Sequence, residues 1–260
     1  MNVLFLGDIY GKAGRKLIVE TLPSLKQEYE INLCIANCEN LSYGRGVTKK
    51  SINQMTTCGV DVFTSGNHLF DKKDSLGFIE DSTNILKPAN YPKGALGKSF
   101  CVFEDSNFQK CAVVCLVGQV FMNVPSINTP FFVMECLLEK QLRGVENIFV
   151  DFHAETTAEK RAFAEYFDGR LAAVVGTHTH IQTADEQILA GGTAFITDVG
   201  MNGPHDSVIG VKKEIILKKL QTGMPQRFIP AKSGLQLNCV VMRLEKGRAV
   251  SIKRILKKYD

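Results

Sequence analysis

Short apolar runs alternate with longer segments of helical pattern along most of this chain. The first run, residues 2–7 (NVLFLG), precedes a helical pattern at residues 14–29. The second run, residues 31–37 (INLCIAN), leads into a glycine-rich loop and another helical pattern, and the third, residues 60–66 (VDVFTSG), precedes one that starts near Lys73. Short strands separated by helices are typical of βαβ units around a buried, largely parallel sheet. We therefore predict an α/β fold.

The middle of the chain departs from this alternation. Residues 98–105 (KSFCVFED) and 110–118 (KCAVVCLVG) are strand-like runs joined by the turn-prone SNFQ, which predicts a hairpin or a pair in a second sheet. The alternation then resumes without an internal repeat or a proline-rich linker, so residues 1–260 are predicted to form one domain. The further predicted elements are helices at 129–143, 156–167 and 209–221 and strands at 145–152, 170–178, 191–200, 235–245 and 249–256.

Composition excludes several classes of protein. Apolar residues make up 45% of the chain and charged residues 22%, as in ordinary globular proteins rather than disordered or collagen-like ones. No window approaches the roughly 20 apolar residues that span a bilayer, and the N-terminus lacks the basic region of a secretory signal. The net charge of +4 is small and lies partly in the closing segment IKRILKKYD, which we expect to be a solvated end. We expect neither a membrane nor nucleic acid as the main partner.

Eight cysteines raise the question of disulfides. None forms a C-x-x-C pair, and several lie inside apolar runs such as CAVVCLV (residues 111–117). Buried, reduced thiols in a cytoplasmic protein are therefore expected.

Polar side chains follow five of the predicted strands. In an open α/β sheet, ligands bind outside the carboxyl ends of the strands, so these side chains are predicted to share one rim. Two carboxylates, two carboxamides and four histidines make a nitrogen and oxygen set suited to a pair of divalent transition metals. The residues are Asp8, Glu39, Asn40, Asn67, His68, His153, His178 and His180.

Two ions roughly 3.5–4 Å apart share a bridging carboxylate in many phosphoesterases. Glu39 is the natural bridge because it lies on the second strand, between the other ligand-bearing loops. The spacing of His178 and His180 fits such a pair, since residues i and i+2 of extended chain face the same side and can each reach one ion.

Structural roles compete with this interpretation. Asp8 alone would serve as a helix N-cap, Asn40 and Asn67 alone as turn formers, and His205 is expected to be structural. The glycine spacing in GDIYGKAGR (residues 7–15) matches neither a dinucleotide fingerprint nor a P-loop. Cys38, beside Glu39, is conceivable as a nucleophile, but it is rather expected to pack beneath the metal loop.

With these residues identified, the chain resembles the calcineurin-like metallophosphoesterases, and within them the bacterial YmdB-type 2′,3′-cyclic-nucleotide phosphodiesterases. The motifs that carry the resemblance are GDIYGKAGR, NCEN, SGNHLFD, DFHAETTAEK, GTHTHIQTAD and TDVGMNG, spread over residues 7–203. Most of the wider superfamily has Asp-x-His where this chain has Asp8-Ile9-Tyr10, and a bridging aspartate where it has ANCEN. Both departures are those of the YmdB type; Cys38 stands where a smaller residue is expected in that family.

The resemblance implies central β-sheets in a sandwich flanked by helices, with the site at the carboxyl ends of the strands. It implies that Glu39 is shared between two ions, usually iron and alternatively manganese. Asp8, Asn40 and His180 would complete one metal site, and Asn67, His153 and His178 the other. His68 would stay unligated and act as general acid toward the substrate.

The implied substrates are cyclic nucleotides, the 2′,3′-cyclic forms first and 3′,5′-cyclic AMP second. Arg45, in the loop LSYGRGVT (residues 41–48), would contact phosphate or base, unless this loop is only a solvated turn. Two alternatives stay open: a phosphomonoesterase or protein phosphatase with the same metal centre, and a nucleotide- or RNA-binding regulator with vestigial activity. A homo-oligomer is also left open.

Overall fold

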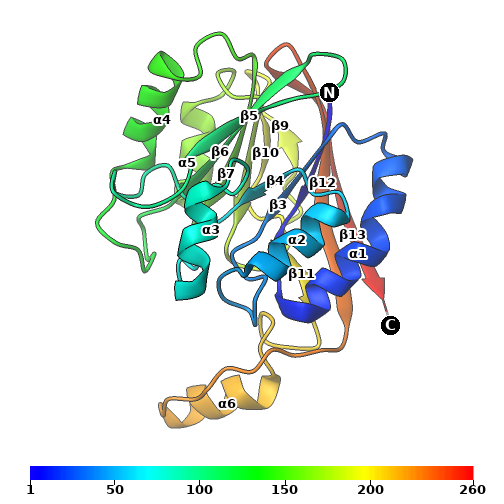
Figure 1. Ribbon diagram of the computed structural model, residues 1–260, viewed down its shortest axis with the longest axis vertical. Coiled ribbons are helices and arrows are strands. Elements are labelled where there is room, and N and C mark those ends of the chain that lie inside the picture. Colours follow the sequence, from blue (N-terminus) through cyan, green and yellow to red (C-terminus); the bar gives the residue numbers. More distant parts are fainter. Residues whose placement is uncertain (260) are drawn as a thin grey trace.

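A computed structural model describes residues 1–259 of the chain as two mixed β-sheets packed face to face, with helices on their outer faces (Figure 1). The predicted α/β class and the helix-flanked pair of sheets are confirmed. The first sheet has seven strands, in the order β2 (Asp8–Ile9), β11 (Met201–Pro204), β12 (Leu235–Glu245), β1 (Asn2–Leu6), β3 (Leu33–Asn37) and β4 (Val62–Thr64), with β13 (Arg248–Tyr259) paired to β12.

The second sheet has six strands, and its inner four run parallel. Antiparallel strands close it at both edges, and one edge is the hairpin expected from residues 98–118. The strand order is β5 (Phe100–Glu104), β6 (Lys110–Val117), β7 (Asn147–His153), β8 (Ala173–Thr177), β10 (Ala194–Ile196) and β9 (Gln187–Ile188).

The core consists of three apolar layers. Alternate residues of β1 supply two of them: Val3 and Phe5 face the second sheet, whereas Leu4 and Leu6 face the helices. Between the sheets, the rings of Phe5 and Phe149 lie 5.3 Å apart. Because both faces of the central strands are covered, their sequences are continuous apolar runs rather than alternating ones.

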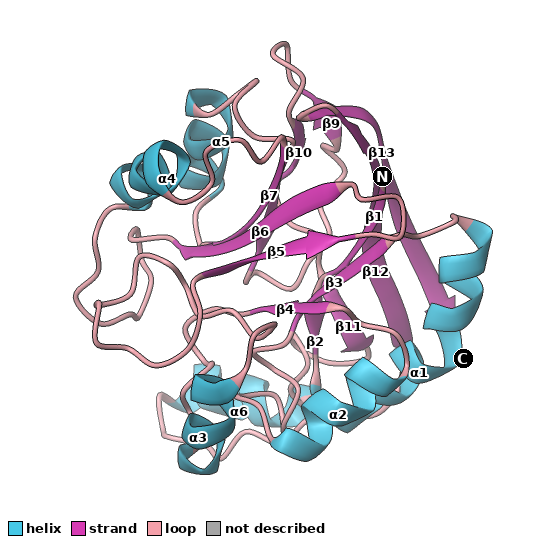
Figure 2. Ribbon diagram, turned by 45° about the horizontal axis from the view of Figure 1, so that its top comes forward, coloured by secondary structure: helices cyan, strands magenta, loops and turns pink. Residues whose placement is uncertain are grey.

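Helices cover each outer face (Figure 2). The helices α1 (Gly11–Glu28) and α2 (Lys49–Thr57) pack on the first sheet, together with α3 (Leu76–Asp81), which a single 3₁₀ turn, η1 (Lys73–Ser75), precedes. The second sheet carries α4 (Pro130–Lys140) and α5 (Thr157–Tyr166). Among residues 1–259, no helix is long and apolar enough to cross a membrane.

Two predicted helices were partly wrong. The helix α6 (Lys213–Thr222) extends away from the body of the molecule and begins at Lys213 rather than Ile209 (Figure 1). Ile209 and Gly210 have positive φ angles, 43° and 95°, which form a tight turn instead of a helix. The first helix begins at Gly11, three residues earlier than predicted. The basic residues near the end of the chain lie on β13, and Lys253, Lys257 and Lys258 are exposed there, in agreement with a solvated segment.

Candidate metal centre

The predicted site residues come together where the ends of strands from both sheets meet. The first sheet supplies Asp8, Glu39, Asn40, Asn67 and His68 from β2 or from the segments that follow β3 and β4, and the second supplies His153, His178 and His180 from the ends of β7 and β8. Glu39, His68 and both residues of the His178/His180 pair line a hollow of about 520 Å³. A larger hollow, about 810 Å³, surrounds Met1 and Asn147 and contains none of these residues.

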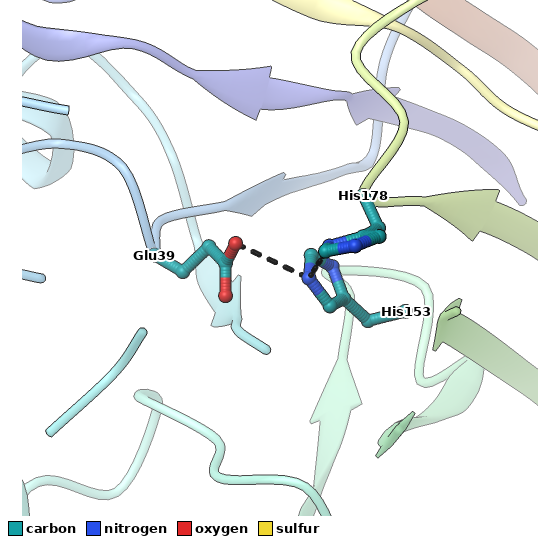
Figure 3. A group of neighbouring side chains, drawn as sticks. All are labelled: Glu39, His153 and His178. Atoms are coloured by element: carbon teal, nitrogen blue, oxygen red, sulfur yellow. Dashed lines mark hydrogen bonds and ion pairs between the residues drawn. The ribbon is translucent and has the colours of Figure 1, made fainter. Parts of the chain in front are cut away.

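Glu39, His153 and His178 form the tightest group at this rim, with potential ligand atoms all within 4.8 Å of one another (Figure 3). The Nε2 atom of His153 lies 3.1 Å from Glu39 Oε1, 3.1 Å from His178 Nδ1 and 3.2 Å from Asn67 Oδ1. Ligand atoms at right angles around an ion about 2.1 Å away lie about 3 Å apart, so these separations fit ligands of one ion.

The charge states of this group also favour a cation. Burial opposes ionisation of Glu39, but the adjacent His153 outweighs burial and lowers the pKa of Glu39. Burial likewise opposes protonation of His153, yet Glu39 raises the pKa of His153 above its ordinary value. Burial and the nearby His153 lower the pKa of His178 to about 3, which keeps that imidazole neutral and able to bind a metal. His153 thus carries a proton at a position where a divalent cation would bind. Binding of the cation would displace that proton.

Asp8 and Asn40 supply a second indication. Among residues 1–259, three buried side-chain oxygens have no hydrogen-bond partner, and two of them are Asp8 Oδ1 and Asn40 Oδ1. An unpaired buried acceptor costs about 1–3 kcal/mol, which a bound cation would offset. Burial also raises the pKa of Asp8, as expected for a carboxylate without a cation. These oxygens fit the first of the two expected ions.

Hydrogen bonds fix which nitrogen each histidine presents. The Nδ1–H of His180 donates to the carbonyl of Ile209 at 3.2 Å, and that of His153 donates to Thr177 Oγ1 at 2.8 Å. The Thr177 hydroxyl in turn donates to buried Asp151 at 2.7 Å. Both histidines therefore direct Nε2 toward the site, as metal-binding histidines do when their other nitrogen is engaged.

The spacing of His178 and His180 was predicted to place both side chains on the same side of an extended segment, and this prediction is wrong. Both residues have positive φ angles, 99° and 67°, so the chain bends sharply after β8. Asp198 holds the bend, because its Oδ2 accepts from the backbone N–H of Thr179 at 3.1 Å and from the Thr179 hydroxyl at 2.8 Å. The hydroxyl of Thr179 is thereby directed at Asp198, although Thr179 still lines the hollow.

A buried ion pair supports this bend. Lys160, from α5, is 1% exposed and donates to Asp198 Oδ2 at 2.8 Å. The sequence offered a signal for both residues, since they lie in the DFHAETTAEK and TDVGMNG motifs, but their contact joins α5 to the distant segment that follows β10. Such residues position the ligands without binding metal.

Replacing Lys160 by methionine is expected to lower the free energy of unfolding by about 3 kcal/mol, because it leaves a buried carboxylate without its counter-charge. Urea denaturation of the metal-free protein measures this loss. The Lys160→Met/Asp198→Asn double variant should recover part of it, and an equal loss in both would contradict the pairing. Lys16→Met, which removes an exposed partner of Glu20, should cost less than about 1 kcal/mol.

His68 lies beside the ligand group rather than in it. Its Nδ1 is 3.0 Å from Asp71 Oδ2, and its Nε2 is 3.5 Å from the amide nitrogen of Asn67. The backbone N–H of His68 donates to Glu39 Oε2 at 3.0 Å. Arg45 also lies 3.0 Å from Asp71 Oδ2, at the mouth of the hollow. Asp71 was missed in the sequence, although it closes the SGNHLFD motif three residues after His68.

Three further residues have clear surroundings. Glu155 Oε2 lies 3.0 Å from Nε2 of His178, a contact that the sequence did not predict. Cys38 is fully buried, and burial raises the pKa of its thiol, so the nucleophilic thiolate is disfavoured there. His205 donates to the Met201 carbonyl at 2.9 Å, in agreement with a structural role.

Gly66 leaves room for the site. A Cβ atom added to it would overlap both the ring of His153 and Oε2 of Glu39. We expect Gly66→Ala to weaken metal binding by about 10–100-fold, as displaced ligand-orienting groups do, while the protein stays folded. Elemental analysis after dialysis against metal measures the change. Gly77→Ala, whose Cβ would meet nothing within 4 Å, is the control and should keep its metal; equal metal contents would contradict the prediction.

Comparison with known proteins gives matches along nearly the whole chain. The sequence pattern of a family described as "YmdB-like protein" matches residues 4–255. The chain is 43% identical to a "2′,3′-cyclic-nucleotide 2′-phosphodiesterase" of Bacillus subtilis, with 98% of this chain and 97% of the relative covered. It is 38% identical to a "putative phosphatase/phosphodiesterase" of Mycoplasma genitalium, with 98% and 92% covered.

Two solved structures are also similar. One is a hypothetical protein from Thermus thermophilus, with a TM-score of 0.94, 36% identity and full coverage of both chains. The other is described as a "novel phosphatase" of Mycoplasma pneumoniae, with a TM-score of 0.94, 36% identity, and 99% of this chain and 93% of that one covered.

Proposed function

Because this chain belongs to the YmdB-like protein family, we propose that it hydrolyses 2′,3′-cyclic nucleotides with a pair of metal ions. The family relationship expected from the motifs is confirmed, and with it the expectation of an enzyme that cleaves phosphoric diesters. The relative from Bacillus subtilis, named for this reaction, supports the substrate class. A calcineurin-like arrangement of the two sheets is part of the same proposal.

The observation that carries the proposal is the convergence of eight polar residues from both sheets at one rim, where five of them line the same hollow. Glu39 would bind both ions. Asp8, Asn40 and His180 would complete the first site, where two buried oxygens have no other partner. Asn67, His153 and His178 would complete the second, where atoms of Glu39, Asn67 and His178 lie 3.1–3.2 Å from His153 Nε2. Carboxylate, amide and imidazole ligands without thiolate suit iron, or manganese as the alternative.

When bound, the ions would supply positive charge next to the phosphate oxygens. They would also lower the pKa of a nearby water, so that it can lose a proton and attack phosphorus. The water forms a new P–O bond and the bond from phosphorus to the ribose O2′ breaks, which leaves a 3′-monophosphate. The departing O2′ needs a proton, and His68, which lines the hollow, would donate it through Nε2. Asp71 accepts from Nδ1–H and holds the ring in that orientation. Arg45 stands at the mouth, within reach of a phosphate oxygen or the base.

The same centre would serve a phosphomonoesterase, and the "phosphatase/phosphodiesterase" relatives make this the second candidate. The test uses protein purified without oxygen, with metal analysis and initial rates on 2′,3′-cyclic AMP, 3′,5′-cyclic AMP and AMP. We expect two metals per chain and a rate on 2′,3′-cyclic AMP at least about tenfold above that on AMP. Faster hydrolysis of AMP would favour the monoesterase, and binding without turnover would favour a vestigial regulator.

Two further expectations belong to this proposal. All eight cysteines are free, which supports a reducing, cytoplasmic location. Both sheets contribute ligands to one centre, which supports a single functional domain over the whole chain.

A further inference from the structure

A second hollow adjoins the one at the metal centre. The second hollow, about 530 Å³, is comparable in volume to the first, about 520 Å³. Tyr43 and Phe228 line both hollows, so the two share a boundary made of aromatic side chains. The remaining residues around the second hollow are Lys72, Arg227, Ile229 and Pro230.

The two aromatic side chains at this boundary are unusually exposed. Tyr43 is 83% exposed and Phe228 45% exposed. Tyr43 also has a φ angle of 59°, a left-handed conformation that is rare for a bulky residue and often marks a functional position. It follows Glu39 and Asn40 by only a few residues, so the loop that carries two expected ligands also presents this ring. Exposed rings beside a phosphate site are suited to stacking on nucleobases.

The charges of the second hollow are all positive. Its lining contains two cations, Lys72 and Arg227, and no carboxylate. Within the described part of the chain, neither cation lies within 4.0 Å of an acidic side chain; the Nζ atom of Lys72 instead lies 5.8 Å from the centre of the Tyr43 ring. Unpaired cations next to exposed aromatic rings are typical of sites that follow a single strand of nucleic acid.

A cyclic mononucleotide does not account for these cations. Its only phosphate is the reacting one, which belongs at Glu39 and the histidines in the first hollow. In the first hollow, the base of the mononucleotide would pack against the apolar side chains of Val208, Ile209 and Val211. A second phosphate, one nucleoside away, occurs when the cyclic phosphate ends a longer strand.

We propose that the second hollow binds the nucleotide that precedes a terminal 2′,3′-cyclic phosphate, so that the substrates include RNA strands with this 3′ end. Tyr43 and Phe228 would stack on bases, and Lys72 and Arg227 would bind the internucleotide phosphate. The reaction is the one described above, with the same P–O bonds formed and broken. This inference rests on the proposed function. In it, the enzyme binds the 3′ end of an RNA strand as a substrate, and it binds neither duplex RNA nor RNA as a regulatory partner.

The test compares kcat/KM of the metal-loaded enzyme for 2′,3′-cyclic AMP and for the dinucleotide ApA that ends in a 2′,3′-cyclic phosphate. Stacking of one more base and one more phosphate contact predict a value about tenfold or more higher for the dinucleotide, mainly through a lower KM. The Lys72→Ala/Arg227→Ala variant should lose this advantage, with the mononucleotide changed less than about twofold. Lys73→Ala/Lys218→Ala removes the same charge from outside both hollows and should keep the advantage.

The outcomes separate the two proposals. Equal kcat/KM for the two substrates, or the same loss in both double variants, would reject the second-nucleotide site while the cyclic-nucleotide reaction stands. Absence of turnover on both substrates, in protein that holds its metals, would reject the proposed function and this site with it.

Discussion

Glu39→Gln is expected to reduce hydrolysis of 2′,3′-cyclic AMP by at least about 10³-fold, because removal of one electrostatic stabiliser already costs about 10²–10³-fold and here metal would be lost as well. Glutamine has nearly the shape of glutamate but no charge. Glu39 is 1% exposed, with its two oxygens directed at His153 Nε2 and at the N–H of His68. In the variant, either His153 Nε2 or the N–H of His68 would face the NH₂ group of glutamine. Metal content and initial rates, measured on the same preparation, test both parts of the expectation.

The control for this variant is Glu165→Gln. Glu165 is half exposed on α5, and among residues 1–259 it pairs only with Arg161 of its own helix, so the same chemical change there should leave metal content and rate unaltered. Thermal unfolding of both variants, with metal removed, shows whether Glu39→Gln still folds. A folded Glu39→Gln protein that keeps two ions and its full rate would contradict the assignment of Glu39 as the shared ligand.

Local sequence patterns predicted the helices and the central strands of this chain, because most central strands are apolar runs, but they missed the short strands β2, β9 and β11. They could not predict the strand order, which depends on contacts between distant segments. Leu4 of β1 pairs with Val241 of β12, near the other end of the chain, while its other neighbour, Cys34, comes from the next strand in sequence. The boundary of α6 was also beyond such patterns, because the turn at Ile209 and Gly210 depends on φ angles that the apolar spacing does not encode.

The candidate site was easier to predict from the sequence than the strand order, because the carboxyl ends of parallel strands lie at one edge of a sheet. That rule brings His153 and His178 together from neighbouring strands of the second sheet. Glu39 follows β3 of the first sheet and reaches them because the two sheets pack face to face, which the rule does not predict. Nor does the rule identify residues that act one layer behind the ligands. Asp198, for example, bends the chain between His178 and His180 only because β8 and β10 are neighbours in the second sheet.

His68→Ala is expected to keep both metal ions and to lose about 10²–10⁴-fold in turnover of 2′,3′-cyclic AMP, the usual contribution of a general acid. Metal should remain because Nδ1 of His68 is engaged by Asp71 and its Nε2 is not in the ligand group. The backbone N–H that positions Glu39 also survives the substitution.

The leaving group distinguishes lost proton donation from general damage to the centre. Ribose O2′ is a strongly basic leaving group that needs a proton, whereas the nitrophenolate of bis(p-nitrophenyl) phosphate leaves without one. His68→Ala should therefore slow the cyclic nucleotide far more than the nitrophenyl ester, and Asp71→Asn, which only loosens the orientation of the ring, should show the same selectivity with a smaller loss. Equal losses on both substrates, or loss of metal, would show that His68 supports the metal centre instead of donating the proton.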